Sequence, residues 1–278
     1  MTNSPHWDES RASRYHHFRY DFAEHSLAGR TLIVAGGTGG LGAALVAVLA
    51  REGADLIVGY RANRERAESL RDAIEEQFGR KIVLIKGDLS DPEVRRDYVD
   101  TAKKLAAERR AILAGAAIFP GDPARVPFDS LDQKALESSL AANYVGPVLL
   151  AREIGEFMES GEGGGIVLLA SMQAVEAFPS SLNYGAPKAA LVHAARILAQ
   201  QWSRVRVNVV APGATVVGMG GASVQAGKYD RYLDSGAISR FGRPEDVARA
   251  ARFFLEPDNY ITGQVLVVDG GLTLRRFK

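Results

Sequence analysis

The sequence has no cysteine among its 278 residues, which excludes disulfide bonds, thiolate catalysis and zinc sites with cysteine ligands. No apolar run approaches the roughly 18 residues that indicate a membrane helix. The formal net charge is only +1, so charge gives no argument for a nucleic-acid or acidic partner. The polar N-terminus lacks the apolar core of a signal peptide. We therefore expect a cytoplasmic protein that binds neither membrane nor nucleic acid.

Apolar segments with the length of buried strands alternate along the chain with longer helical patterns. The predicted strands are Thr31–Ala35, Asp55–Tyr60, Lys81–Lys86, Ala111–Ile118, Gly165–Ala170, Val205–Ala211 and Gln264–Val268. The predicted helices are Leu41–Glu52, Arg64–Phe78, Pro92–Arg109, Leu131–Met158, Tyr184–Arg204 and Pro244–Glu256. This alternation predicts a doubly wound α/β fold, a parallel sheet of about seven strands with helices on both faces. We find no internal repeat and no linker, and expect a single domain.

Residues 1–28 precede this pattern and are predicted to form an N-terminal extension to a domain of residues 29–278. They hold four of the five histidines: His6, His16, His17 and His25. We interpret the segment as packed on the domain or on a partner subunit, with a metal-binding or substrate-covering arm as the alternative. Because adjacent residues do not share a face in regular structure, the pair His16-His17 is a poor metal site, and we expect no metal.

A glycine-rich segment follows the first predicted strand and opens the first helix. Its spaced glycines are Gly36, Gly40 and Gly42, with Thr38 and Leu41 between them. Glycines let a backbone approach a pyrophosphate, and a helix N-terminus offers free N–H groups and partial positive charge. A plain tight turn is the alternative. The strand–loop–helix context favours a dinucleotide cofactor.

The end of the second predicted strand indicates which dinucleotide binds. An NAD site places a carboxylate there, on the ribose 2′-hydroxyl. This strand ends instead in Tyr60 and Arg61, and Arg64 starts the next helix. Cations at a helix N-terminus oppose the helix dipole, which a bound 2′-phosphate would explain. A solvated basic turn is the alternative, and we expect NADP(H) rather than NAD(H).

Two further stretches are predicted to contact the cofactor. Asp88 and Leu89 follow the third strand, where the Asp88 carboxylate can accept a hydrogen bond from an adenine amino group. A helix cap is the rival role, better suited to Ser90 or Asp91. At the fourth strand, small residues suit the close approach of a flat cofactor: Ala114, Gly115 and Ala116.

The stretch Ser171–Lys188 carries three reactive side chains spaced for proton transfer. Tyr184 and Lys188 are four residues apart, on one face of a helix. Ser171 lies thirteen residues before Tyr184, at the carboxyl end of a buried strand, where ligands bind in open α/β sheets. An ammonium close to a phenol lowers the phenol's pKa, so the phenol can exchange a proton with an alcohol or carbonyl. Pro187 fits only the first turn of a helix, which places the pair at the helix N-terminus.

Asn143 is a polar residue inside the long predicted helix Leu131–Met158. A satisfied core amide is one interpretation. Gly146 and Pro147 close by indicate an irregular turn, which could direct the asparagine toward a site instead.

With these residues in this order, the chain resembles the short-chain dehydrogenase/reductase family, in the subgroup that includes the bacterial 3-oxoacyl-carrier-protein reductases. The resemblance covers about residues 27–274. The glycine loop, Asp88, the pair Pro212-Gly213 and the tail of residues 240–271 match the family's motifs. The resemblance implies a Rossmann-type fold and a catalytic tetrad: Asn143, Ser171, Tyr184 and Lys188.

The resemblance also implies a role for each member of the tetrad. Tyr184 would exchange a proton with the substrate oxygen, which Ser171 would polarise. Lys188 would lower the phenol's pKa and hold the nicotinamide ribose, and Asn143 would position a water connecting Lys188 to bulk. Members of the family often form tetramers through the two long helices, so we expect a homo-oligomer, a tetramer or a dimer.

The chain departs from the family pattern in three places. Ala114-Gly115-Ala116-Ala117 replaces the usual Asn-Asn-Ala-Gly after the fourth strand. Gly39 stands where many NADPH users carry an arginine. The threonine expected over the nicotinamide aligns with Val217, and Thr215 is the nearest hydroxyl.

We predict an NADP(H)-dependent enzyme that reduces a ketone to a secondary alcohol, with a 3-oxoacyl compound as one candidate. The alternatives are an NAD(P)-dependent sugar or secondary-alcohol dehydrogenase and a non-catalytic nucleotide-binding regulator. Residues 214–240 are interpreted as a mobile cover over the site. Together with residues 172–182 they form an apolar ceiling with few charges, which favours a neutral or acyl-tethered ketone over a free acid.

Overall fold

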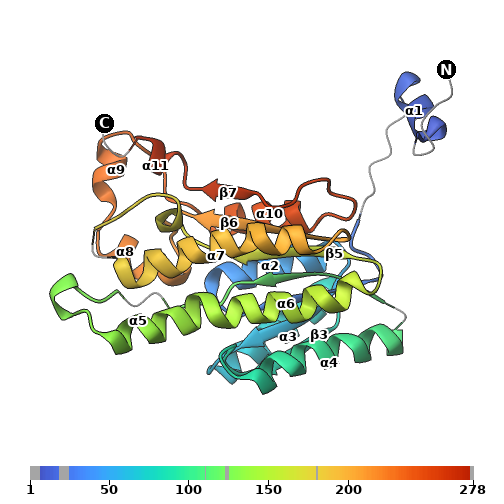
Figure 1. Ribbon diagram of the computed structural model, residues 1–278, viewed down its shortest axis with the longest axis horizontal. Coiled ribbons are helices and arrows are strands. Elements are labelled where there is room, and N and C mark those ends of the chain that lie inside the picture. Colours follow the sequence, from blue (N-terminus) through green and yellow to red (C-terminus); the bar gives the residue numbers. More distant parts are fainter. Residues whose placement is uncertain (1–6, 19–24, 110, 123–124, 180, 276–278) are drawn as a thin grey trace.

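A computed structural model describes residues 7–18, 25–109, 111–122, 125–179 and 181–275 (Figure 1). Its strands are β1 (Arg30–Ala35), β2 (Asp55–Tyr60), β3 (Ile82–Lys86), β4 (Ile112–Ile118), β5 (Gly164–Leu169), β6 (Val205–Pro212) and β7 (Val265–Val268). Its α-helices are α1 (Glu9–His16), α2 (Gly40–Arg51), α3 (Arg64–Phe78), α4 (Pro92–Arg109), α5 (Gln133–Leu140), α6 (Gly146–Glu159), α7 (Leu182–Gln201), α8 (Gly221–Gln225), α9 (Asp230–Asp234), α10 (Pro244–Leu255) and α11 (Leu272–Arg275). Shorter turns are η1 (Phe128–Ser130), η2 (Ala141–Val145), η3 (Met172–Ala174) and η4 (Gly218–Gly220).

The strands form one parallel sheet in the order β3-β2-β1-β4-β5-β6-β7. This confirms the parallel sheet predicted from the sequence. The strands are mostly apolar runs, as expected where helices cover both faces. The winding changes direction at β1, which lies between β2 and β4. The carboxyl ends of β1 and β4 therefore frame the crevice in which ligands bind in this architecture.

Helices cover both faces of the sheet, which confirms the doubly wound fold. On one face α4, α6 and α7 bury residues such as Tyr98, Ile154 and Leu191 against the strands. On the other face α2, α3 and α10 do the same with residues such as Leu45 and Phe254. The two layers hold the strand ends, and the loops that follow them, in fixed positions.

The helical stretch predicted over Leu131–Met158 is present, with one irregularity inside it. The structure has α5 and α6, joined by the π-helical turn η2. A π-turn adds a residue to the helical repeat and often occurs at functional sites. Asn143 lies inside η2 and is fully buried. The irregular turn expected near Gly146 is therefore present, and it immediately precedes α6.

The cover, residues 214–240, folds into η4, α8 and α9. Tyr229, Tyr232 and Ile238 from the cover pack with Met172 and Leu272 in a small apolar cluster. This cluster fixes the cover to the residues that follow β5 and β7. Its mobility stays a prediction from the sequence.

The helix α1 stands apart from the sheet in Figure 1. Residues 1–6 and 19–24 of the predicted extension, His6 included, lie outside the described residues. Within the part that the structure describes, no three histidine, aspartate or glutamate side chains are grouped to hold a metal. In the same part, no helix has the length and apolar character needed to cross a membrane.

Candidate active site

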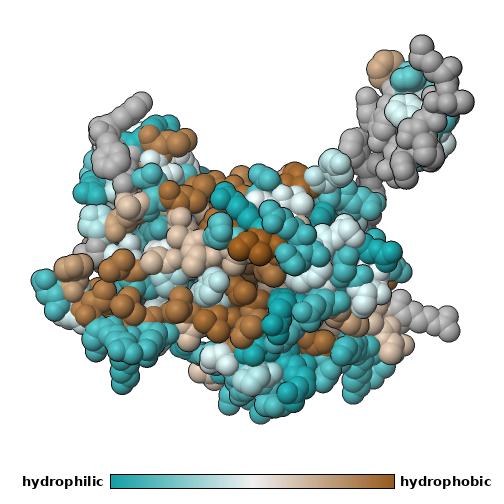
Figure 2. Space-filling view, viewed as in Figure 1, coloured by the Kyte–Doolittle hydropathy of each residue, from teal (hydrophilic) through white to brown (hydrophobic). Residues whose placement is uncertain are grey.

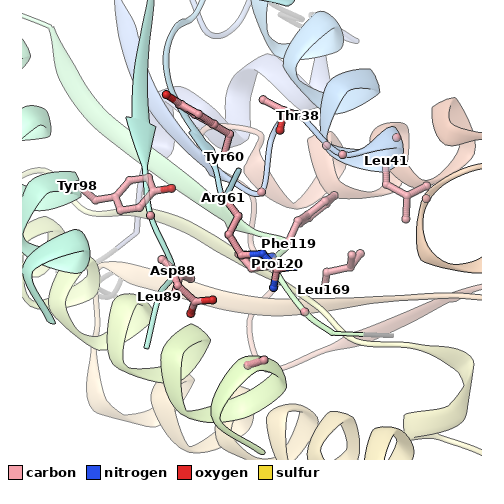
Figure 3. A pocket seen from close by; sticks show the side chains of 18 residues that line it. Thr38, Leu41, Tyr60, Arg61, Asp88, Leu89, Tyr98, Phe119, Pro120 and Leu169 are labelled. Atoms are coloured by element: carbon pink, nitrogen blue, oxygen red, sulfur yellow. The ribbon is translucent and has the colours of Figure 1, made fainter. Parts of the chain in front are cut away.

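A cleft of about 240 Å³ opens at the carboxyl ends of β1 to β4 (Figure 3). Among the residues lining it are nine of those predicted to bind the cofactor: Gly36, Thr38, Gly40, Leu41, Gly42, Tyr60, Arg61, Asp88 and Leu89. Phe119, Pro120 and Gly121, which follow β4, also line it, and so does Gly218 of the cover. Segments far apart in the sequence thus meet at the point where the winding changes direction.

The glycine loop is tight because α2 begins directly against it. A Cβ on Gly42 would collide with the carbonyl oxygen of Gly36 and lie 2.7 Å from the Cα of Gly37, so a side chain there would push the helix away. Gly39 is the N-cap of α2 and offers no side-chain acceptor. The N–H groups of the first helical turn are left free for an anion, as a pyrophosphate site requires.

Three arginines near the end of β2 differ in their surroundings. Arg61 points from the strand end into the cleft (Figure 3). Arg64 instead forms an ion pair with Glu68 at 2.8 Å on α3 and does not line the cleft. The Nε of Arg66 donates to the carbonyl oxygen of Thr38 at 2.8 Å. The second cation beside the glycine loop is therefore Arg66 rather than the predicted Arg64.

Asp88 lies in the cleft, and its Oδ1 accepts hydrogen bonds at 2.9 Å from the backbone N–H and the hydroxyl of Ser90. Asp91 accepts from the backbone N–H of Glu93 at the start of α4, which is the capping role considered for it. The structure thus gives the capping role to Asp91 and leaves Asp88 at the cleft wall.

The small residues predicted to approach the cofactor at β4 lie deeper in the sheet. Ala114, Gly115 and Ala116 are interior residues of β4, buried and away from the cleft. A Cβ on Gly115 would lie 2.7 Å from the carbonyl oxygen of Gly165 on β5. Strand β4 continues to Ile118. The residues after β4 that line the cleft therefore begin at Phe119.

Ser171, Tyr184 and Lys188 come together beside this cleft. A small cavity lined by Ser171 and Tyr184 shares Leu41 and Leu169 with the cofactor cleft, so the two are adjacent. The hydroxyl of Ser171 lies close enough to the phenol of Tyr184 to lower its pKa, and it accepts from the backbone N–H of Gln173 at 3.2 Å. A hydroxyl and a phenol are thus placed to contact one substrate oxygen.

Lys188 is fully buried, and its ammonium donates to the carbonyl oxygen of Leu169 at 2.8 Å. Asn143 approaches the same place from η2. A Cβ on Gly121 would lie 2.7 Å from Asn143 Oδ1 and 3.2 Å from Lys188 Nζ, so both polar groups flank this glycine. The sequence argument missed Gly121, whose only signal is its position just after β4.

The amide of Asn143 fixes the loop after β4. Its Oδ1 accepts from the backbone N–H of Asp122 at 3.2 Å, and its Nδ2 donates to the carbonyl oxygen of Asp122 at 3.0 Å. The Nδ2 also contacts the carbonyl oxygen and hydroxyl of Ser139, each at 3.1 Å. Asn143 therefore positions the loop beside Lys188.

The predicted place of Pro187 in the first helical turn is wrong. Helix α7 begins at Leu182, which puts Pro187 inside the helix. Proline lacks the N–H that would reach the carbonyl oxygen of Asn183. The hydroxyl of Ser139 donates to that carbonyl instead. The same Ser139 contacts Asn143, so α5 and α7 are linked at the residues predicted to be catalytic.

Burial is the largest influence on the pKa values of Tyr184 and Lys188. Burial raises the pKa of Tyr184 above its usual value, opposed by the nearby hydroxyl of Ser171 and the charge of Arg125. Burial lowers the pKa of Lys188 to about 7. The sequence argument expected Lys188 to lower the phenol's pKa. The structure gives the opposite net direction, because desolvation of a phenolate outweighs the nearby favourable interactions.

Pro212, Gly213 and Thr215 line the small cavity together with Ser171 and Tyr184. Thr215 is buried, and its hydroxyl donates to the carbonyl oxygen of Val217 at 2.9 Å. Thr215, whose hydroxyl is nearest to the family's threonine position, thus stabilises the start of the cover through this hydrogen bond.

The fold and the placement of Tyr184 define the class of protein, a dinucleotide-dependent oxidoreductase. The profile of the family described as enoyl-(acyl carrier protein) reductase matches residues 35–273. The chain belongs to the short-chain dehydrogenase/reductase family.

Individual relatives agree with this family. The chain is 32% identical over 253 residues to the uncharacterized oxidoreductase YghA of Escherichia coli (strain K12), covering 88% of this chain and 83% of that protein. It is 26% identical over 260 residues to the NADPH-dependent aldehyde reductase 2, chloroplastic, of Arabidopsis thaliana, covering 89% and 95%. A solved structure described as an NAD(P) dependent gluconate 5-dehydrogenase from Beutenbergia cavernae with bound NADP has a TM-score of 0.78 at 31% identity, covering 90% and 98%.

Proposed function

We propose that this oxidoreductase uses NADP(H) and reduces a ketone to a secondary alcohol. The observation that carries the cofactor choice is Arg61, which points into the cleft at the end of β2 (Figure 3), where an NAD enzyme has a carboxylate. A guanidinium there can form paired hydrogen bonds with a 2′-phosphate. Arg66, held against the glycine loop through Thr38, adds positive charge at the same end. The names of two relatives, one NADPH-dependent and one with bound NADP, support the same choice.

The described residues fit a dinucleotide. Because Gly42 has no side chain, the glycine loop and α2 can lie close together. The free N–H groups in the first turn of α2 would hold the pyrophosphate. Asp88 would accept from the adenine amino group, and Lys188 would bind the nicotinamide ribose. When bound, the cofactor supplies the hydride for reduction of a carbonyl carbon.

The chain's own residues supply the proton and position the substrate. Tyr184 would donate its phenolic proton to the substrate oxygen, because a phenol with a raised pKa is protonated at neutral pH. Ser171, whose hydroxyl lies close to that phenol, would donate to the same oxygen. Lys188, fixed to the Leu169 carbonyl, would stabilise charge beside the phenol. Asn143 holds the loop beside the ammonium and would border the route of a water from bulk.

Arg61→Ala should weaken NADPH binding about 10- to 100-fold and leave NADH binding nearly unchanged. The estimate follows from a charged hydrogen bond's contribution of about 1.5–3 kcal/mol. Calorimetric titration of both cofactors measures it. Arg71→Ala on α3 is the matched control, since Arg71 pairs with Asp72 and does not line the cleft. Equal weakening of both cofactors by Arg61→Ala would contradict the proposal, as would NADH binding as tightly as NADPH to the unmodified enzyme.

A sugar or secondary-alcohol dehydrogenase is the second candidate. The likeness to a structure named as a gluconate 5-dehydrogenase favours it. The same residues would then run in reverse, with Tyr184 accepting the alcohol proton. Initial rates in both directions, with simple oxo compounds (a 3-oxoacyl thioester included) and with polyols, separate the candidates. A non-catalytic nucleotide-binding role predicts no turnover in either direction.

We also propose that the enzyme is a homo-oligomer assembled through α5 and α7. Large apolar side chains are exposed along this face: Leu136, Leu140, Val145, Leu182 and Ile197. Figure 2 shows apolar side chains gathered over α5, α6 and α7. Apolar patches of this kind mark protein interfaces, and a second copy is the occupant we propose. The cytoplasmic location stays a prediction from the sequence.

Replacing both Leu136 and Ile197 with glutamate should reduce the assembly to a smaller species, because two buried charges per subunit would face each other across the contact. Light scattering coupled to size-exclusion chromatography gives the mass. Leu274→Glu on α11, where the side chain is 88% exposed, is the control and should leave the mass unchanged. A monomeric unmodified protein would refute the proposed interface.

A further inference from the structure

Arg125 lies over the catalytic tyrosine. It follows Gly121 and Asp122 in the chain between β4 and η1, and its guanidinium carbon is 5.2 Å from the centre of the Tyr184 ring. It lines the small cavity that also holds Ser171 and Tyr184. Arg125 lies outside residues 172–182 and 214–240, the apolar ceiling predicted from the sequence. The site therefore has a cation beside the group that transfers the proton.

One nitrogen of the Arg125 guanidinium, Nε, is buried and lacks an acceptor among the described residues. No ion pair involving Arg125 is formed in that part of the chain either. A buried donor without an acceptor is unusual in a folded protein, and a bound ligand is one explanation for it. The Arg125 side chain thus has hydrogen-bonding capacity directed at the substrate cavity.

The cover carries a second cation, Lys228, whose charge interacts with that of Arg125. Burial lowers the pKa of Lys228, in the cover, and the charge of Arg125 lowers it further. Lys228 forms no ion pair with a described carboxylate. Two like charges that approach each other without a neutralising group are unfavourable until an anion binds between or beside them. The loop after β4 and the cover thus each carry one cation, and of the two only Arg125 lines the cavity.

The cavity is small and has a second unsatisfied polar group. Its volume is about 50 Å³, which holds only a few water-sized groups. The amide oxygen of Gln173, which is 7% exposed and lines the same cavity, has no hydrogen-bond partner among the described residues. Arg125 and Gln173 together indicate a cavity that takes a small polar molecule rather than a long apolar chain.

We infer that the substrate carries a carboxylate that binds Arg125, so that the enzyme acts on a short oxo acid or the matching hydroxy acid. The inference rests on the proposed function, since it places the reacting oxygen at Tyr184 and Ser171. It replaces the neutral ketone expected from the sequence. The cofactor's phosphates are held elsewhere, at the glycine loop and Arg61, so they leave Arg125 for the substrate.

The test compares oxo acids with their uncharged methyl esters: pyruvate, acetoacetate and levulinate, each against its ester. For the unmodified enzyme with NADPH, kcat/KM should be about 10- to 100-fold higher for the acid in at least one pair, the range expected from a charged hydrogen bond. Arg125→Met should abolish this preference. The pair with the largest preference gives the distance between the carbonyl and the carboxylate.

The ratio of acid to ester separates a substrate contact from an effect on the tyrosine. Loss of the Arg125 charge also acts on Tyr184, but this lowers the rates with acid and ester alike. Arg231→Met is the matched control, because Arg231 also stacks on a tyrosine, Tyr232, at 4.7 Å but does not line the cavity. It should leave the ratio unchanged. Arg125→Lys should restore part of the preference.

Two results would overturn the inference: no pair in which the unmodified enzyme prefers the acid, or a preference that survives in Arg125→Met. Failure of the proposed function gives a different result, the absence of turnover with every acid and ester. In that case, calorimetric titration of the three acids and esters into the enzyme with NADP⁺ still tests the inference. Binding of an acid that Arg125→Met abolishes would support it, and no difference between acids and esters would reject it.

Discussion

Tyr184→Phe should lower the turnover of a carbonyl substrate by at least two orders of magnitude and leave NADPH affinity within about twofold of the unmodified enzyme. The substitution removes the proposed proton donor and almost no volume, and general acid catalysis is typically worth about 10²–10⁴-fold. Tyr232→Phe is the matched control: this buried phenol belongs to the cover and accepts from Arg231 at 2.7 Å, away from the cavity. Steady-state rates and cofactor titrations give both quantities.

The pH dependence should follow from the raised pKa of Tyr184. Reduction needs the protonated phenol. Because Tyr184 keeps its proton at neutral pH, the rate of reduction should not decrease there through deprotonation of the phenol. Oxidation of the alcohol needs the phenolate, so its rate should rise with pH in that range. Normal turnover by Tyr184→Phe would show that the proton comes from another group.

Lys188→Met should abolish measurable turnover and weaken NADPH binding, since one ammonium serves both the phenol and the ribose in the proposed site. Methionine keeps most of the length of the side chain and removes its charge. The variant should remain folded, because Lys188 is fully buried among packed residues and methionine fills irregular apolar space well. Full NADPH affinity with slow chemistry alone would show that the ribose contact is absent.

The same substitution should raise the thermal stability of the cofactor-free protein at low pH. The pKa of Lys188 falls from 10.5 to about 7 on folding, because burial disfavours the charged form. The unfolded chain therefore binds more protons between these values, and stability rises with pH there. The cost to folding stability of burying the Lys188 ammonium is full below about pH 7 and absent above about pH 10.5. The gain in Tm from Lys188→Met should shrink accordingly as pH rises.

One opposing effect limits the size of this gain. Methionine cannot donate to the Leu169 carbonyl, which Lys188 contacts at 2.8 Å, and an unsatisfied buried group costs about 1–3 kcal/mol. Thermal melts at a series of pH values, without cofactor, measure the balance. A Tm difference that does not change between pH 6 and pH 10 would show that Lys188 is not charged differently in the two states.

The regular part of the fold was predictable because each strand is a short apolar run with a helical pattern after it. Such runs cannot reach water when helices cover both faces, so the sequence directly reflects the layers. The positions of Ser171, Tyr184 and Lys188 were predictable for a related reason. They follow or begin regular elements, and a helix repeat fixes the spacing of two of them.

The missing parts of the site depend on contacts between distant segments. Arg125 reaches Tyr184 because Asn143 holds Asp122 and because Asn183 Oδ1 accepts from the backbone N–H of Val126 at 3.2 Å. No local pattern in the loop after β4 encodes these bonds. The pKa of Tyr184 was mispredicted for the same kind of reason, since its burial is set by residues from several elements.

The central position of β1 has a consequence for how the chain folds. Thr31 pairs with Asp55 on β2 but also with Leu113 on β4, 82 positions further along the chain. During synthesis β1, β2 and β3 can associate first, which leaves the other edge of β1 without a partner until β4 emerges. An unpaired apolar edge is a site of aggregation, and pairings that span long loops form slowly. The strand that builds the glycine loop is thus also the point at which a nascent chain is most vulnerable to misassembly.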